Sequence, residues 1–236
     1  MKRKAILFVV TVMLIGNASA GASDAPVKAP LMTAAIQAEM TPEQALERLM
    51  KGNERFVRRH RGAQQNYIKK ARLTAGGQHP AAIVLSCIDA RVPPEIVFDQ
   101  GVGNIFVTRV AANVLNKDVL GGMEYATAAV GAKLIVVMGH DSCGAVTGAC
   151  KGLKLGNLTS LFRKIRPAVK EAGREMKTHD CTDSAFIDRI AEKNVANVAR
   201  AIPKKSPVIG KLVEDGRVKI VGAMYDLATG KVSIVD

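Results

Sequence analysis

Aromatic residues are scarce in this sequence, and tryptophan is absent: the 236 residues include six Phe and three Tyr, 4% of the chain. Basic runs such as Arg58-Arg59-His60-Arg61 therefore lack interleaved aromatic residues, and they match no nucleic-acid-binding motif. The net charge is +13, but the basic residues are spread along the chain. We expect a solvated basic surface and no nucleic-acid partner.

Long hydrophobic runs are absent after the N-terminus. The apolar run from Ala5 to Ile15 has eleven residues, and crossing a bilayer takes roughly 20. Lys2-Arg3-Lys4 precedes this run and Ala18-Ser19-Ala20 follows it, which is the layout of a secretory signal. We expect residues 1–20 to be a signal peptide, the protein to be periplasmic or secreted, and no membrane partner after signal removal. A retained membrane anchor is the alternative.

Two short polar segments each follow an apolar run that is typical of a buried strand. Cys87-Ile88-Asp89-Ala90-Arg91 follows residues 81–85, and His140-Asp141-Ser142-Cys143 follows residues 134–138. Zinc prefers four tetrahedral N and S ligands, and catalytic zinc sites have three protein ligands and a fourth position for water. The predicted ligands of one Zn²⁺ ion per chain are Cys87, His140 and Cys143.

Asp89 and Arg91 are the nearest polar residues outside this ligand set. Their spacing of two directs both side chains to the same side of an extended backbone, so we expect them to pair. Zinc lowers the pKa of a bound water to roughly 7, which makes a nucleophile available at neutral pH. Asp89 is predicted to accept a hydrogen bond from that nucleophile, and Arg91 to keep Asp89 ionised and oriented.

The sequence contains only four cysteines, which in an oxidising compartment would allow two disulfides in three pairings. Cys87 and Cys143 each lie beside zinc-compatible partners, which argues against a disulfide between them. Cys150 lies seven residues after Cys143, roughly 10 Å along a helix and too far to share one metal. Cys150 and Cys181 are the candidates for a disulfide, and two unpaired buried thiols are the alternative.

The two motifs resemble the zinc signature of the β-class carbonic anhydrases, Cys-x-Asp-x-Arg followed by His-x-x-Cys. Together with the signal segment, they favour an exported bacterial member of that class. The resemblance covers the chain from about residue 41 to the C-terminus and includes Ala45–Val57, Phe98–Gly101, Glu124–Ala126 and Ile220–Gly230. It implies reversible hydration of CO2 to bicarbonate and a proton. The alternatives are a zinc hydrolase of carbon disulfide or carbonyl sulfide on the same scaffold, and a non-catalytic zinc-binding protein.

The resemblance has further implications for the site and the assembly. In this family the Asp of the first motif sometimes binds zinc and closes the site, so Asp89 is either a fourth metal ligand or the partner of Arg91. Pockets in the family lie at subunit interfaces, and N-terminal helices reach onto a partner subunit. A homodimer or higher homo-oligomer is therefore expected. Segments similar to the family that line or support the pocket contain Val92, Gln100 and Tyr125.

The absence of tryptophan excludes one device of the resembled family, a regulatory bicarbonate pocket built with Trp, Arg and Tyr. Other polar residues are predicted to have structural roles. Asp141 and Ser142, between two predicted ligands, are expected to hold the loop before the next helix. His60, His79 and His179 stand in polar or turn-rich surroundings and are expected on the surface.

Alternating strand and helix patterns predict an α/β fold over residues 41–236, after a linker over residues 21–40. We expect a mostly parallel sheet with an antiparallel edge, flanked by helices on both faces. Strands are predicted at residues 81–85, 105–110, 133–138, 218–224 and 232–235. Helices are predicted after Thr41, Pro93 and Cys143 and at residues 119–130, 158–171, 184–200 and 207–214. No internal repeat is visible, which excludes solenoids and propellers. Both metal motifs fall at carboxyl ends of strands, where open α/β sheets bind ligands.

Overall fold

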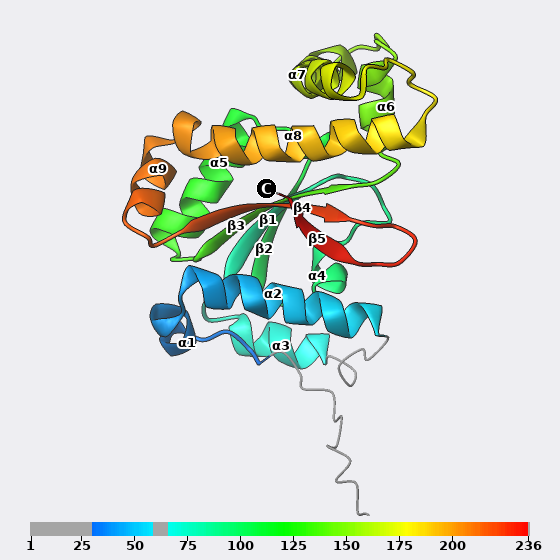
Figure 1. Cartoon of the computed structure of the whole chain (residues 1–236). Coiled ribbons are helices and arrows are strands. Elements are labelled where there is room, and N and C mark those ends of the chain that lie inside the picture. Colours follow the sequence, from blue (N-terminus) through cyan, green and yellow to red (C-terminus); the bar gives the residue numbers. More distant parts are fainter. Residues whose placement is uncertain (1–29, 59–65, 236) are drawn as a thin grey trace, which may run out of the picture.

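The structure is a computed structural model that describes residues 30–58 and 66–235 (Figure 1). The expected signal peptide, most of the expected linker and His60 lie outside the described residues. The described end of the linker contains a short helix, α1 (Ala34–Glu39), whose first turn is capped by the Thr33 side chain. The sequence did not predict α1 because six residues are too few for a periodic apolar pattern.

A five-stranded sheet with the order β2-β1-β3-β4-β5 forms the centre of the molecule. The strands are β1 (Ala82–Ser86), β2 (Ile105–Arg109), β3 (Leu134–His140), β4 (Lys219–Tyr225) and β5 (Val232–Val235). The first four pair in parallel, and β5 pairs antiparallel with β4, so the predicted sheet is confirmed. Every residue of the inner strands β1 and β3 is buried, because helices cover both faces.

Helices form a layer on each face of the sheet (Figure 1). On one face lie α2 (Pro42–Val57), α3 (Tyr67–Thr74) and α4 (Pro94–Val97). The other face carries α5 (Lys117–Glu124), α8 (Ser184–Lys205) and α9 (Pro207–Glu214). Beyond α8, a separate apolar cluster joins it to α6 (Gly144–Cys150) and α7 (Leu158–Met176). Two short helical turns, η1 (Ala111–Asn113) and η2 (Tyr125–Ala129), complete the connections.

Helix α2 begins where the sequence predicted. Thr41 is its N-cap and forms a capping box with Gln44, and Pro42 occupies the first turn. Its apolar face, which includes Ala45 and Leu49, is fully buried in the cluster that contains the β1 and β3 side chains. Helix α2 packs on the sheet of its own chain. That N-terminal helices of this chain reach onto a partner subunit stays a prediction.

A close approach to α4 and to the last hairpin fixes α2 in place. A Cβ atom on Gly52 would lie 1.8 Å from the Phe98 carbonyl oxygen, so only glycine fits there. The next residue, Asn53, is 3% exposed. Its amide nitrogen donates to the Gly230 carbonyl at 2.8 Å, and its oxygen accepts from the Val232 amide at 2.8 Å. One buried side chain therefore ties α2 to the turn that leads into β5.

The other elements differ from prediction mainly at their ends. The helix predicted over residues 119–130 ends at Glu124 and continues as the π-helical turn η2, where the Val130 amide bonds the Tyr125 carbonyl. Helices α7 and α8 run five residues beyond their predicted ends, to Met176 and Lys205. Helix α3 was not predicted, since it buries no residue and so has no apolar stripe to detect. Within the described ranges, no helix is long and apolar enough to span a membrane.

Candidate metal centre

Cys87, His140 and Cys143 come together at the carboxyl end of the sheet. Cys87 directly follows β1, His140 is the last residue of β3, and Cys143 is the N-cap of α6. Because β1 and β3 are adjacent parallel strands, their carboxyl ends meet at one edge. The two sulfurs and the ring nitrogen all lie within 4.8 Å of one another, and all three residues are buried. The structure thus gathers the three predicted ligands into one cluster.

The His140 ring is oriented as a metal ligand would be. Its Nδ1 lies 2.8 Å from the Asp141 carbonyl oxygen, which only accepts hydrogen bonds, so Nδ1 carries the proton. Nε2 is then an acceptor, yet it is buried and makes no hydrogen bond to any described residue. A buried polar nitrogen without a partner is costly. A metal ion beside the two sulfurs would satisfy it.

The two thiols shift each other's pKa in opposite directions. A hydrogen bond between Cys143 and Cys87 is the main reason why the pKa of Cys87 lies well below its usual range. The same contact, together with burial, raises the pKa of Cys143. Two sulfurs and one imidazole nitrogen are the donor set that zinc prefers, and metal binding requires deprotonated thiols. The residues present therefore fit a zinc ion.

Asp89 is paired with Arg91 beside this cluster. The Arg91 side chain donates to both carboxylate oxygens of Asp89, at 2.9 and 2.8 Å, and its backbone amide donates at 3.0 Å. These hydrogen bonds hold the pKa of Asp89 well below its usual range, although partial burial opposes them. Oδ2 of Asp89 is 3.8 Å from Nε2 of His140. Of the two arrangements left open by the sequence, the structure has the pair with Arg91.

Asp141 and Ser142 shape the loop that carries the second and third ligands. Oδ1 of Asp141 accepts from the Leu227 amide at 2.7 Å, which connects the loop to the segment after β4. Ser142 has a φ of +51°, a left-handed conformation that is strained for a residue with a side chain. Its amide donates to Asp188 on α8 at 2.8 Å. Both contacts agree with the predicted loop-holding role.

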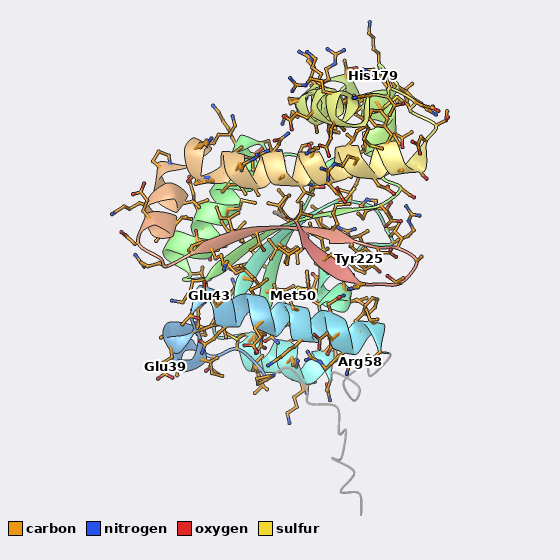
Figure 2. The ribbon with its side chains drawn as sticks, viewed as in Figure 1. Glu39, Glu43, Met50, Arg58, His179 and Tyr225 are labelled. Carbon is orange, nitrogen blue, oxygen red and sulfur yellow. A yellow bond between two sulfur atoms is a disulfide. The ribbon has the colours of Figure 1, made fainter. Side chains whose placement is uncertain are left out.

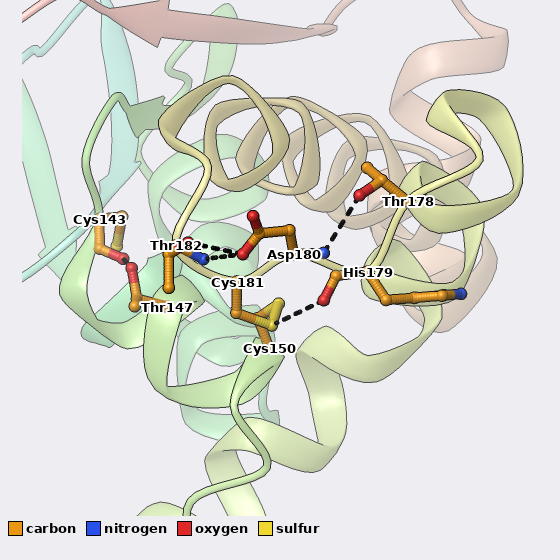
Figure 3. The surroundings of a disulfide bond; sticks show 8 residues. All are labelled: Cys143, Thr147, Cys150, Thr178, His179, Asp180, Cys181 and Thr182. Carbon is orange, nitrogen blue, oxygen red and sulfur yellow. Dashed lines mark hydrogen bonds between the residues drawn. A yellow bond between two sulfur atoms is a disulfide. The ribbon is translucent and has the colours of Figure 1, made fainter.

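Cys150 and Cys181 form a disulfide, and their Cα atoms are 5.8 Å apart (Figure 3). The bond joins the last residue of α6 to the connection between α7 and α8. Cys87 and Cys143 remain free thiols. The alternative of two unpaired thiols at Cys150 and Cys181 is therefore wrong. Since α6 runs from the predicted ligand Cys143 to the disulfide, both of its ends are fixed.

The residues predicted to line or support the pocket have different surroundings. Gln100 is 1% exposed, accepts a hydrogen bond from Arg48 and donates to the Phe98 carbonyl, so it supports the contact between α2 and α4. Val92 is fully buried in the apolar cluster that contains the β1 and β3 side chains. Tyr125 is 55% exposed.

The two described histidines outside the cluster have no role in it. His179 is exposed, as predicted, and its ring packs edge-on against Phe186 at 6.3 Å. In Figure 2 it lies beside α7, far from Tyr225, the residue of β4 that is in register with His140. His79 is half-buried.

Sequence reasoning missed two contributors to the site. Arg109, the last residue of β2, donates through Nε to the Cys87 carbonyl at 2.9 Å and through Nη2 to the Asp89 carbonyl. Ala112 donates its backbone amide to the Cys87 sulfur at 3.3 Å. Arg109 could have been found from the sequence, since it lies near the carboxyl end of a predicted strand, as both motifs do. Ala112 had none, because it acts only through its backbone.

Comparison with known proteins agrees with this geometry. Residues 82–232 match the family model described as carbonic anhydrase. Carbonic anhydrase 2 of Mycobacterium tuberculosis is 35% identical over 196 residues, 83% of this chain and 93% of the relative. The β-carbonic anhydrase CafA of Aspergillus fumigatus is 26% identical with a TM-score of 0.63, covering 82% of this chain and 90% of its own. A structure from a study of two tetrameric β-carbonic anhydrases of Sordaria macrospora has a TM-score of 0.65 at 22% identity, covering 80% and 96% of the two chains.

The fold and the three-residue cluster define an α/β enzyme with a metal centre at the carboxyl end of its sheet. The chain belongs to the carbonic anhydrase family and has the β-class fold. Its reaction is the reversible hydration of CO2 to bicarbonate and a proton.

Proposed function

We propose that Cys87, His140 and Cys143 hold one Zn²⁺ ion per chain, and that this ion serves the hydration of CO2. The observation that carries the proposal is the buried Nε2 of His140, which has no hydrogen-bond partner and lies within 4.8 Å of two free thiols. Bound there, zinc would act as a Lewis acid and lower the pKa of a water molecule to roughly 7.

Asp89 and Arg91 are proposed to orient the reacting water. Asp89 is held ionised by Arg91, so its carboxylate only accepts hydrogen bonds and cannot itself protonate the nucleophile. Its Oδ2 lies on the His140 side of the pair, where it would fix the direction of a water O–H. Arg91 is 57% exposed, so the site opens to solvent on this side. Protons released by the reaction would leave to buffer by the same route.

Metal content and CO2 hydration, measured on one preparation, test the assignment. Stopped-flow hydration with a pH indicator gives the rate, and metal analysis gives zinc per chain. The Cys87→Ala variant is expected to lose zinc and activity together. The matched control is the double variant Cys150→Ala/Cys181→Ala, which removes two other cysteines and is expected to keep both. Full zinc stoichiometry in Cys87→Ala would contradict the ligand set.

We also propose that the chain forms a homo-oligomer. Three large apolar side chains beside the first motif and α4 are exposed in the single chain: Ile88 at 61%, Ile96 at 53% and Val102 at 41%. Large apolar side chains exposed in segments that flank a functional site favour a protein interface. The relatives from Sordaria macrospora are described as tetrameric. Light scattering after gel filtration is expected to give a multiple of the chain mass. The Ile96→Ser variant is expected to shift the measured mass toward that of the monomer. A monomeric parent chain would refute the proposal.

We propose, finally, that the N-terminal segment directs export to the periplasm or beyond the cell. Support comes from the sequence: three basic residues, a short apolar run and small residues up to Ala20. Cell fractionation followed by N-terminal sequencing tests this. The expected result is a mature chain outside the cytoplasm that starts at Gly21. A cytoplasmic chain that still begins at Met1 would contradict it.

A further inference from the structure

The backbone beside the metal centre adopts an unusual conformation. In the turn η1, Ala112 has φ 51° and ψ 32°, and Asn113 has φ 43°. Both are left-handed, and neither residue is glycine. An L-residue in this region is strained by a clash between Cβ and the backbone, so the conformation persists only where the surroundings fix it. Two such residues in succession indicate that the turn is held in place for a reason.

One buried side chain of α8 hydrogen-bonds to the turn. The amide nitrogen of Asn194 donates to the Ala112 carbonyl at 2.8 Å, and Asn194 is 2% exposed. Within the turn, the Asn113 amide bonds the Val110 carbonyl at 2.8 Å. The first contact joins residues that are 82 positions apart in the sequence. Asn194 thus provides a hydrogen bond from α8 to the left-handed residue Ala112.

Two glycines allow α8 to come close enough for this contact. A Cβ on Gly139 in β3 would lie 2.6 Å from a methyl group of Val195, and one on Gly222 in β4 would lie 2.8 Å from the other methyl. Val195 is the neighbour of Asn194 in α8 and is fully buried. Because Gly139 and Gly222 carry no side chains, α8 packs close to the sheet and therefore lies near η1.

The result of this arrangement is a hydrogen bond to a predicted metal ligand. With Ala112 left-handed, its backbone N–H points to the Cys87 sulfur at 3.3 Å in a buried setting. An N–H aimed at a thiolate stabilises its charge and fixes its orientation, as outer partners of metal ligands do. We propose that Asn194 is a positioning residue of the metal centre. By bonding the Ala112 carbonyl it fixes the backbone of Ala112, and thereby the direction of the Ala112 N–H toward the Cys87 thiolate. This inference rests on the proposed zinc site and names the residue that tunes it.

The competing explanation is that Asn194 only satisfies a buried carbonyl and supports the core. Metal affinity and the electronic spectrum of the centre separate the two. Zinc affinity is measured by chelator competition. The thiolate-to-cobalt charge-transfer band of the Co²⁺-substituted protein reports on the sulfur ligands directly. Neither readout requires catalytic turnover.

Asn194→Ala removes the anchor and is expected to lower zinc affinity about 10- to 100-fold and to shift the charge-transfer band. The matched control is Asn53→Ala, which removes another buried asparagine bonded to backbone groups away from the metal centre. It is expected to lower stability and leave affinity and spectrum unchanged. Asn194→Ser, a milder change in the same direction, is measured in parallel.

A rescue variant makes the test independent of core damage. Glycine adopts the left-handed conformation without strain, so Ala112→Gly combined with Asn194→Ala should regain most of the lost affinity. An unchanged spectrum and affinity in Asn194→Ala, an equal shift in Asn53→Ala, or no rescue by Ala112→Gly would each overturn the inference. If the parent chain binds no zinc, the proposed function itself fails. If the parent binds zinc and only these variants behave otherwise, the inference alone fails.

Discussion

Replacing Arg91 by alanine tests whether Arg91 positions Asp89 for catalysis or mainly stabilises the fold. Arg91 gives Asp89 two side-chain hydrogen bonds, but the guanidinium is 57% exposed. Water screens such a pair, so its contribution to the free energy of unfolding is small. The loss in turnover is expected to be larger. Removing a residue that orients a group at a metal centre lowers activity about 10- to 100-fold, or about 1.4 to 2.7 kcal/mol in the activation free energy.

The assay compares three quantities for Arg91→Ala and the parent chain: kcat for CO2 hydration by stopped flow, zinc per chain, and the melting temperature. The variant is expected to keep its zinc and nearly all of its stability while kcat falls. Arg189→Ala is the matched control. Arg189 also bonds two carboxylates, Glu175 and Glu192, at 35% exposure, but it lies on α8 outside the site. The Arg189→Ala variant should leave kcat unchanged.

Three results would refute this reasoning. Full kcat in Arg91→Ala would show that Asp89 needs no partner to remain in position. Loss of zinc in Arg91→Ala would show that the Asp89–Arg91 pair supports the ligands themselves and not the reacting water. A fall in kcat of equal size in Arg189→Ala would assign the effect to a general change of surface charge.

Three further predictions concern stability. Cys150→Ala/Cys181→Ala opens a loop with a sequence separation of 31 and should lower the free energy of unfolding by about 3 to 4 kcal/mol in denaturant titrations; no change would mean that the bond is absent. Gly52→Ala should destabilise by about 3 kcal/mol because of its backbone clash, whereas Gly121→Ala, in open space on α5, should stabilise by up to about 1 kcal/mol; equal effects would contradict the packing of α2. Hydrogen bonds from Lys193 and Arg189 lower the pKa of Glu175, so its stabilisation is present above the unfolded pKa of about 4.3 and is lost as pH falls through the folded value. Glu175→Gln should therefore lower the melting temperature at pH 7 and less so below about pH 4, and a difference independent of pH would refute the linkage.

The sequence predicted two kinds of feature: strands and helices with a clear apolar pattern or cap, and a site built from residue types that bind metal. The unbroken apolar runs predicted β1 and β3, because a strand that is buried on both faces has apolar residues at every position. The polar residues that follow them gave Cys87, His140 and Cys143, since parallel strands end at one edge. The start of α2 was predictable from Thr41 and Pro42, which form a cap whose chemistry is local.

What the sequence could not predict depends on contacts between distant backbone groups. Ala112 contributes only a backbone N–H, and its left-handed backbone accepts a hydrogen bond from Asn194, 82 positions away. The close approach of α2 at Gly52 depends on the carbonyl of Phe98, the residue that follows α4. Helix α3 buries no side chain, so no apolar period marks it. The pairing of Cys150 with Cys181 required a distance that residue spacing does not provide.

The most direct test of the central claim is X-ray absorption at the zinc edge on the purified chain, with the metal content of the same sample. The cluster of Cys87, His140 and Cys143 predicts one zinc per chain, bound by two sulfur ligands and one imidazole nitrogen, with a light atom in the remaining position. A spectrum with any other number of sulfur ligands, or a chain that binds no zinc and joins Cys87 to Cys143 in a disulfide, would contradict it.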